Sequence, residues 1–270
     1  MDKLIITAAL TGAEVTREQQ PNLPLTPVEI AEEALACYKA GASIVHIHAR
    51  TAEGEPTQDE AVYREIKREI ELRCPVIIQP TTGGAVWHTF DQRKAPLNLN
   101  PEMATLSCGT CNFGDDVFMN SMPFMRQLAQ EMLERGIKPE LEIFERGMIQ
   151  NALKLSKEGL LKPPLHFDLV LGVPGACPGE IEDLNYLVKQ LPNGSTWTVA
   201  GVGKVQLPLI TSAILMGGHV RVGFEDNVYY SKGVLAESNA AFVSRVVRLA
   251  NELGRPVATP GEARKILGLA

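Results

Sequence analysis

The chain has 270 residues, of which 45% are hydrophobic and 21% charged, and its formal net charge is -6 at pH 7. This length fits a single α/β barrel, and the acidic balance without a basic stripe argues against nucleic acid as a partner. No apolar run reaches the roughly 20 residues of a membrane span, and the first residues lack the basic and apolar regions of a signal peptide. Together with five dispersed cysteines, these features predict a cytoplasmic protein without a membrane partner.

Short apolar runs alternate with longer amphipathic segments along the whole chain. The apolar runs predict eight strands, over residues 4–10, 43–48, 76–79, 103–107, 141–144, 167–171, 196–199 and 220–224. The amphipathic segments predict seven helices, over residues 28–40, 59–72, 122–135, 148–157, 181–190, 207–215 and 238–253. This alternation predicts an α/β fold, a (β/α)8 TIM barrel that forms a single domain over residues 1–270, with an open doubly wound sheet as the alternative.

Two helix starts are marked by a threonine followed by proline, with glutamate three residues after the threonine. Thr26 and Glu29 form one such pair, and Thr259 and Glu262 form the other. This spacing is that of a capping box with proline at the first helical position. The second pair predicts a short C-terminal helix over residues 263–267.

His46 and His48 lie one residue apart in the second predicted strand. Side chains at i and i+2 of a strand point to the same side, about 7 Å apart along it, so both imidazoles face one pocket. Histidines in such a strand can also be structural, bonded to neighbouring backbone. The flanking Ile44 and Ile47 indicate a core strand, where burying two imidazoles costs desolvation free energy unless each has a polar partner. A divalent metal ion would be a partner for both.

A metal held by two histidines usually needs at least one carboxylate and an open position for water or substrate. In a β/α barrel the candidates follow the strands. Four acids lie there: Glu14, Glu142, Glu225 and Asp226. Of the two adjacent acids, Glu225 can ligate the ion while Asp226 pairs with Arg221 and acts as an ionised base, although a solvated loop is the alternative. Glu142 lies between two apolar residues and therefore needs a partner.

Two glycine-containing loops can present donors to an anionic ligand. Residues 81–84 offer two threonine hydroxyls and backbone N–H groups to a carboxylate or phosphate, although a plain tight turn explains them as well. Gly201, Gly203 and Lys204 follow the seventh predicted strand, where β/α barrels often bind phosphate. A diphosphate-bearing cofactor could dock at this second loop.

Taken together, six segments resemble the β-keto acid cleavage enzymes: residues 11–14, 46–48, 82–84, 101–105, 141–144 and 221–227. The resemblance spans nearly the whole chain and is strongest to the members of lysine fermentation, through residues 12–14, 20–24 and 233–241. It implies a β/α barrel that binds Zn²⁺, or another divalent metal, and uses acetyl-CoA as co-substrate. The implied reaction converts a 3-keto acid, here 3-keto-5-aminohexanoate, and acetyl-CoA into acetoacetate and a new acyl-CoA, here 3-aminobutyryl-CoA.

The resemblance also implies roles for individual residues. The metal ligands would be His46, His48 and Glu225. The catalytic residues would be Asp226, which takes a proton from the keto acid, with Arg221 orienting it and Glu142 supporting the charge network. Substrate would be bound by Glu14 at its ammonium group and, at its carboxylate and carbonyl, by Thr81, Thr82, Gly84 and Thr105. CoA would be bound by Gly201, Gly203 and Lys204.

The sequence departs from the family at two of these positions. The family often has serine where Thr81 stands and arginine where Lys204 stands. The resemblance further implies a homo-oligomer, a tetramer, whose partners are the keto acid and acetyl-CoA.

Three other functions remain open at this point. An amidohydrolase would need the His-x-His motif on its first strand and further histidines on strands five and six, where Glu142 stands instead. A metal-dependent aldolase or lyase shares the same Lewis-acid chemistry and is distinguished by its independence of acetyl-CoA. A non-catalytic metal- or metabolite-binding barrel would show no turnover.

Overall fold

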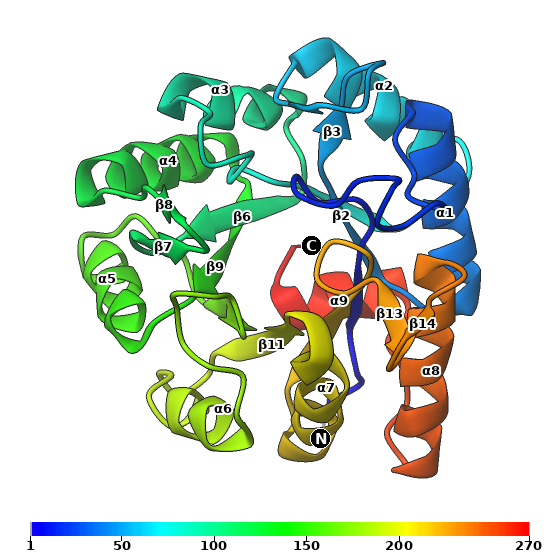
Figure 1. Cartoon of the computed structure of the whole chain (residues 1–270). Coiled ribbons are helices and arrows are strands. Elements are labelled where there is room, and N and C mark those ends of the chain that lie inside the picture. The colour runs from blue at the N-terminus through cyan, green and yellow to red at the C-terminus, as the bar shows by residue number, and fades with distance from the viewer. Residues whose placement is uncertain (1, 270) are drawn as a thin grey trace.

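The computed structural model describes residues 2–269. Eight parallel strands form one sheet in the order β5-β2-β1-β12-β11-β10-β9-β6. Their bounds are β1 Ile6–Ala9, β2 Ile44–Ile47, β5 Ile77–Pro80, β6 Met103–Ser107, β9 Lys138–Ile143, β10 His166–Leu171, β11 Thr196–Gly201 and β12 His219–Val222. Figure 1 looks down the axis of the barrel and shows the helices, except the last one near the centre, as an outer ring. The predicted β/α barrel is confirmed.

The helices agree with the amphipathic segments of the sequence. They are α1 Pro27–Ala40, α2 Glu60–Glu71, α3 Phe90–Lys94, α4 Met122–Arg135, α5 Arg146–Lys157, α6 Ile181–Val188, α7 Gln206–Met216, α8 Asn239–Glu252 and α9 Pro260–Leu267. Two 3-10 turns precede β6 and α7, over Ala95–Leu99 and Gly203–Val205. The capping boxes of Thr26 and Thr259 are both formed, so the predicted starts are confirmed. The α3 helix was not predicted, and α9 begins ahead of the predicted residue 263. No helix within residues 2–269 is long and apolar enough to cross a membrane.

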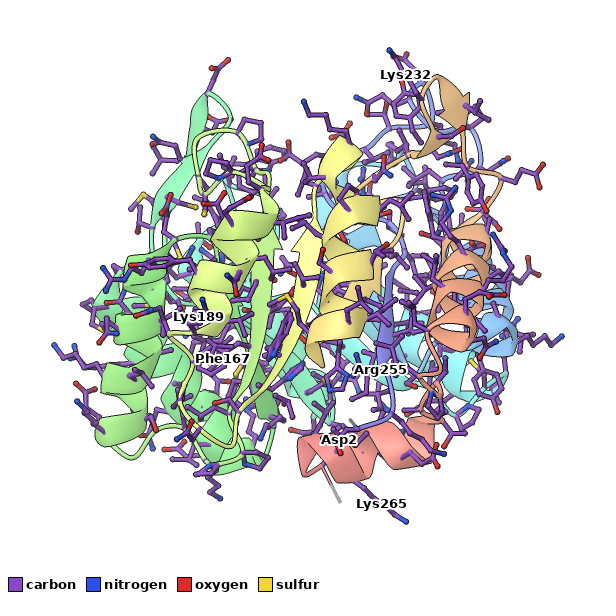
Figure 2. The ribbon with its side chains drawn as sticks, turned by 90° about the horizontal axis from the view of Figure 1, so that it is seen from below. Asp2, Phe167, Lys189, Lys232, Arg255 and Lys265 are labelled. Atoms are coloured by element: carbon purple, nitrogen blue, oxygen red, sulfur yellow. The ribbon has the colours of Figure 1, made fainter. Side chains whose placement is uncertain are left out.

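One end of the barrel is closed by apolar side chains and by α9. Ile5, Ile44, Ile77 and Met103 are fully buried and pack against α9. Figure 2 shows α9 lying across this end, near the labelled Asp2 and Lys265, while Lys232 marks the opposite end. Ligands therefore reach the interior from the end where the parallel strands finish.

Farther along the same strands, the interior changes from apolar to polar. The side chains two residues later face the same way, and they are Thr7, His46, Gln79 and Thr105, each at most 1% exposed. Buried polar groups need partners. This change therefore marks the half of the barrel in which the functional groups lie.

Side-chain hydrogen bonds close the barrel between β5 and β6, the two ends of the sheet. The Thr82 backbone N–H donates to Thr105 Oγ1 at 3.0 Å, and Thr82 Oγ1 donates to the Thr105 carbonyl at 2.7 Å. The Arg93 Nε–H donates to the Thr82 carbonyl at 2.8 Å. Both threonines are fully buried. They therefore stabilise the wall of the barrel.

Three short antiparallel hairpins stand at the open end. They pair β3 Ala49–Arg50 with β4 Pro56–Thr57, β7 Cys111–Phe113 with β8 Asp116–Phe118, and β13 Tyr229–Ser231 with β14 Val234–Leu235. Figure 2 shows the β13–β14 hairpin, which bears the labelled Lys232, at the end of the barrel opposite α9. The loops that follow β2, β6 and β12 thus form a raised rim around the entrance.

Candidate active site and metal centre

A cavity of about 280 Å³ opens where the parallel strands end. Its size and position are typical of the active site of a β/α barrel. Most of the predicted site residues line it: Glu14, His46, His48, Thr81, Gly84, Glu142, Arg221, Glu225 and Asp226. These residues come from β1, β2, β5, β9 and β12 or from the loops that follow them. Folding therefore gathers groups as far apart in the sequence as Glu14 and Asp226.

The His46, His48 and Glu225 side chains converge on one point. Oε1 of Glu225 lies 3.5 Å from Nε2 of each histidine, and one ligand atom from each residue lies within 4.8 Å of the others. The two imidazole rings are 5.3 Å apart at their centroids. Two imidazole nitrogens and a carboxylate oxygen form a donor set that zinc accepts, with a fourth position left for substrate.

Gln79 fixes the orientation of His46. The Nδ1 of His46 lies 2.8 Å from Oε1 of Gln79, and an amide oxygen only accepts, so Nδ1 carries the proton and Nε2 keeps the lone pair that could bind a metal. Burial lowers the pKa of His46 to about 4. The ring is therefore neutral at pH 7, the form that ligates a metal. The sequence analysis missed Gln79, whose position two residues before Thr81 on the inward face of β5 is the signal for it.

One oxygen of Glu225 shows whether a cation fits between the three side chains. Its Oε2 is buried and has no hydrogen-bond partner within residues 2–269. Burial acts to raise its pKa, but Arg221, His46 and His48 hold the pKa of Glu225 well below its usual range. An ionised, buried oxygen without a donor requires a positive partner. The three residues therefore fit a divalent metal ion.

Gly12 allows Glu225 to reach this position. It has a φ of +68°, and a Cβ atom there would lie 2.8 Å from Cγ of Glu225. Arg50 holds the same loop from the other side, because its guanidinium donates to the carbonyls of Gly12 at 3.0 Å and Val15 at 2.8 Å. Glu14 lies in this loop, exposed at the mouth of the cavity. Its carboxylate is therefore presented to an entering ligand by a fixed backbone.

Arg221 stands at the centre of the buried charges. Its Nε and Nη2 donate to the two carboxylate oxygens of Asp226, each at 2.9 Å, and Nη2 also donates to Glu225 at 2.6 Å. Its Nη1 lies 3.8 Å from Glu142 and 3.7 Å from Asp168. Two-point pairing of guanidinium and carboxylate fixes both groups geometrically. Arg221 therefore orients Asp226 next to the candidate metal ligands.

Asp226 and Glu142, two of the acids beside Arg221 that are not candidate metal ligands, both have raised pKa values. Burial raises the pKa of Asp226, and the Arg221 guanidinium acts against that rise. Burial also raises the pKa of Glu142 to about 7, against Arg221 and a 2.5 Å hydrogen bond donated by the Ser107 hydroxyl. A carboxylate with a raised pKa is a stronger base, which suits proton abstraction near neutral pH.

A second layer of charged residues lies beneath this site and was not predicted. His166 Nε2 lies 3.0 Å from Oε2 of Glu140, and both side chains are at most 1% exposed. Asp168 is fully buried, and neither of its carboxylate oxygens has a hydrogen-bond partner in the part of the chain that the structure describes. Burial raises the pKa of Asp168 well above its usual range, with Glu140 acting in the same direction. Alternation along β9 and β10 was the signal for these residues.

Five predicted contact residues do not line the cavity. Thr82 and Thr105 lie in the barrel wall, bonded to each other. Gly201 gives room to the start of α7, because a Cβ there would lie 2.6 Å from Cα of Gln206. Gly203 donates its N–H to the Asp226 carbonyl at 2.7 Å, and the neighbouring Lys204 is exposed. The loop they form supports Asp226 and reaches the cavity through Val202.

Thr81 and Gly84 do line the cavity. The Thr81 hydroxyl accepts a hydrogen bond from the Gly83 N–H at 2.9 Å. Gly84 has a φ of +62°, and a Cβ there would lie 2.6 Å from Nδ1 of His88. The segment is thus a tight turn that lies on the cavity, and its contact with an anionic ligand stays a prediction.

Comparison with known proteins places this chain in a family. A sequence model of the family described as "beta-keto acid cleavage enzyme" matches residues 3–269. The 3-keto-5-aminohexanoate cleavage enzyme of Fusobacterium nucleatum subsp. nucleatum is 55% identical over 271 residues, which cover 100% of this chain and 99% of the relative. The 3-oxoadipate:acetyl-CoA acetyltransferase of Cupriavidus necator is 37% identical over 268 residues, covering 98% and 94%.

A solved structure shares the fold. The apo structure of ObcA superposes with a TM-score of 0.80 at 22% identity, covering 92% of this chain and 66% of that chain. At this identity the likeness concerns the architecture alone. The family model and the full-length relatives go further: the chain belongs to the β-keto acid cleavage enzyme family.

Proposed function

We propose that this protein is a divalent-metal-dependent enzyme that converts 3-keto-5-aminohexanoate and acetyl-CoA into acetoacetate and 3-aminobutyryl-CoA. The observation that carries the proposal is the convergence of His46, His48 and Glu225 beside the Arg221–Asp226 pair in one cavity. Family membership and the name of the 55% identical relative support the substrate.

The donor set favours zinc as the metal. Two neutral imidazoles and one carboxylate are a common set for catalytic zinc. When bound, the ion would supply Lewis acidity at the β-keto oxygen and lower the free energy of a carbanion at C2. His46 and His48 would supply the nitrogen ligands, and Glu225 the oxygen ligand.

Asp226 is the base in this proposal. Its carboxylate accepts the C2 proton of the keto acid, and its raised pKa makes that transfer more favourable. Arg221 holds the carboxylate at two points throughout. Glu142, on the far side of Arg221, balances the guanidinium charge when Asp226 becomes protonated.

The group transfer then balances without a further reactant. The C2 carbanion attacks the carbonyl carbon of acetyl-CoA, forming a carbon–carbon bond and releasing the CoA thiolate. The thiolate attacks the C3 carbonyl carbon, and the C2–C3 bond breaks to give 3-aminobutyryl-CoA and the acetoacetate carbanion. Asp226 returns its proton to that carbanion.

Glu14 is the proposed contact for the ammonium group of the keto acid. Its carboxylate lies at the mouth of the cavity, and the loop that bears it is held by Arg50. A carboxylate is the natural partner of an ammonium ion. Thr81, which lines the cavity, is the proposed contact for the substrate carboxylate.

The rim would receive the rest of the CoA molecule. Lys204 is exposed in the loop after β11, whose Val202 lines the cavity, so its ammonium group can meet a phosphate outside. We further propose a cytoplasmic homotetramer that acts in lysine degradation.

One assay tests the proposal. Purified protein is given acetyl-CoA with 3-keto acids whose side chains are cationic, neutral or anionic. Acetoacetate is measured together with the metal content of the same sample. The proposal expects zinc, strict dependence on acetyl-CoA and a preference for the cationic 3-keto acid. Cleavage without acetyl-CoA would instead identify a metal-dependent aldolase or lyase, and no turnover of any 3-keto acid would favour a binding protein.

A further inference from the structure

The cavity wall is divided into a polar half and an apolar half that follow the order of the strands. The strands β5, β2, β1 and β12 are consecutive in the barrel, and they or their loops contribute nearly all of the charged and hydroxyl-bearing lining. The strands β11, β10, β9 and β6 form the other half. Their apolar contribution, here called the apolar arc, consists of Phe113, Phe118, Phe144, Val170, Val173, Pro174 and Val202. Glu142 is the only charged lining residue among the described residues of that half.

Three aromatic rings form the centre of the apolar arc. The ring centroids of Phe113, Phe118 and Phe144 lie 6.0 to 6.4 Å apart, and every pair meets edge to face. This arrangement is a favourable geometry for aromatic rings, so the three side chains hold one another in place. They present a continuous apolar surface to the cavity.

The β7–β8 hairpin that carries two of these rings is anchored at both ends. At its base the buried Arg93 guanidinium lies 4.8 Å from the Phe118 ring and donates to the carbonyls of Met119 and Thr82. At its tip the Gly114 N–H donates to the Pro174 carbonyl at 2.9 Å. The hairpin is therefore a fixed wall of the cavity.

The two reactants of the proposed function differ in the same way as the two halves of the wall. The keto acid has a carboxylate at one end and an ammonium group at the other, so burial against apolar rings would cost desolvation free energy. The acyl thioester end of acetyl-CoA carries no charge, and its phosphates are at the far end of the molecule. Only this reactant gains by burial on the apolar arc.

We propose that the apolar arc is the binding subsite for the acyl thioester and the adjoining pantetheine chain, and that Phe113 limits the length of the acyl group. This inference rests on the proposed function. Because Val202 belongs to the apolar arc and Lys204 follows it, a thioester in this subsite would extend toward an exposed cation at the rim. The keto acid would occupy the opposite half, against the metal ligands and Glu14.

Phe113→Ala tests the subsite, with Val86→Ala as the matched control. Both residues are half-buried apolar residues of the cavity lining, but Val86 belongs to the polar half, in the loop after β5. In Phe113→Ala we expect the KM for acetyl-CoA to rise about tenfold and the KM for the keto acid to stay within about twofold, as for loss of apolar contact with one reactant. The rate with butyryl-CoA relative to acetyl-CoA should also rise about tenfold. Val86→Ala should change neither the KM for acetyl-CoA nor the relative rate with butyryl-CoA.

A rise in the KM for the keto acid alone in Phe113→Ala would assign the apolar arc to the keto acid side chain and overturn the inference. Unchanged KM values for both reactants would overturn it too.

Equilibrium binding of S-acetylpantetheine, which lacks the nucleotide, gives a second measurement that needs no turnover. It should weaken about tenfold in Phe113→Ala and remain unchanged in Val86→Ala. Wild-type protein that shows no acetyl-CoA-dependent cleavage contradicts the proposed function, whereas equal binding of S-acetylpantetheine to wild type and Phe113→Ala contradicts only the subsite.

Discussion

Arg221 binds Asp226 at two points, with Nε and Nη2 each 2.9 Å from a different oxygen of the carboxylate. The same Nη2 contacts Glu225 at 2.6 Å, so one guanidinium holds two adjacent acids. Their pKa values nevertheless move apart, because burial raises the pKa of Asp226 while Arg221 and the histidines hold that of Glu225 low. Paired acids with diverging pKa values can take different roles. Here one fits a metal ligand and the other a base.

The first prediction separates these roles by mutation. His46→Ala removes one of the converging ligand atoms and should empty the metal site. Asp226→Asn keeps all three of those atoms and should retain the metal while cleavage falls by at least about 100-fold, as expected for loss of a general base. Metal analysis and acetoacetate formation on the same preparations decide the matter. An active Asp226→Asn enzyme would rule out the proposed base.

The second prediction concerns Gln79. Removing the hydrogen bond to the second nitrogen of a ligating histidine typically weakens metal binding about 10- to 100-fold, so Gln79→Leu should raise the zinc dissociation constant by that factor. Gln206→Leu is the matched control, since Gln206 is also a buried glutamine but its amide oxygen faces Asn227 instead of a histidine. Competition with a chelator measures both variants. Equal zinc affinity in the two would contradict the role given to Gln79.

The sequence was most informative where the two-residue repeat of a strand determines which way a side chain points. The spacing of His46 and His48 on a strand predicts that both side chains face one pocket, and the structure places them there with ring centroids 5.3 Å apart. The alternation of strands and helices likewise predicts a parallel sheet, because parallel strands need crossover helices, and eight β/α units favour a barrel over an open sheet. The direction of a side chain and the type of an element depend on local geometry alone.

Other features depend on which strands become neighbours, and the sequence did not reveal them. Thr82 and Thr105 resemble substrate contacts, yet β5 and β6 meet in space and their side chains close the barrel. Alternation along the strands marks Asp168 and Gln79 as inward-facing, but their roles depend on Arg221 and His46, which lie on other strands. Register across the barrel, which no single segment encodes, decides all four.

The third prediction tests the contact between Glu14 and the substrate. Glu14→Gln removes the negative charge at the mouth of the cavity, so the KM for 3-keto-5-aminohexanoate should rise at least about tenfold, the value of one charge-assisted hydrogen bond. The KM for 3-ketohexanoate, which keeps the carboxylate but has no ammonium group, should remain within about twofold. Glu18→Gln, an exposed change in the same loop, is the control. Equal effects of Glu14→Gln on both substrates would remove Glu14 from the ammonium site.

The fourth prediction concerns the pH dependence of stability. Burial raises the pKa of Glu142 from 4.5 to about 7, so the folded protein binds this proton more tightly than the unfolded chain does. The stability that Glu142 contributes is therefore fully present below pH 4.5 and is lost as the pH rises through about 7. Glu142→Gln resembles the protonated form at every pH and should remove this part of the decline in Tm.

Glu29 provides a control of opposite sign for the same measurement. Hydrogen bonds from the Thr26 and Leu25 backbone and from Arg17 lower its pKa to about 2, although burial acts to raise it. Its contribution to stability is present above pH 4.5 and is lost as the pH falls toward about 2. Thermal unfolding of wild type, Glu142→Gln and Glu29→Gln across both ranges should therefore show changes of slope in different windows. A Glu142→Gln protein whose Tm declines between pH 4.5 and about 7 as steeply as the wild type would show that this carboxyl is not the group that titrates there.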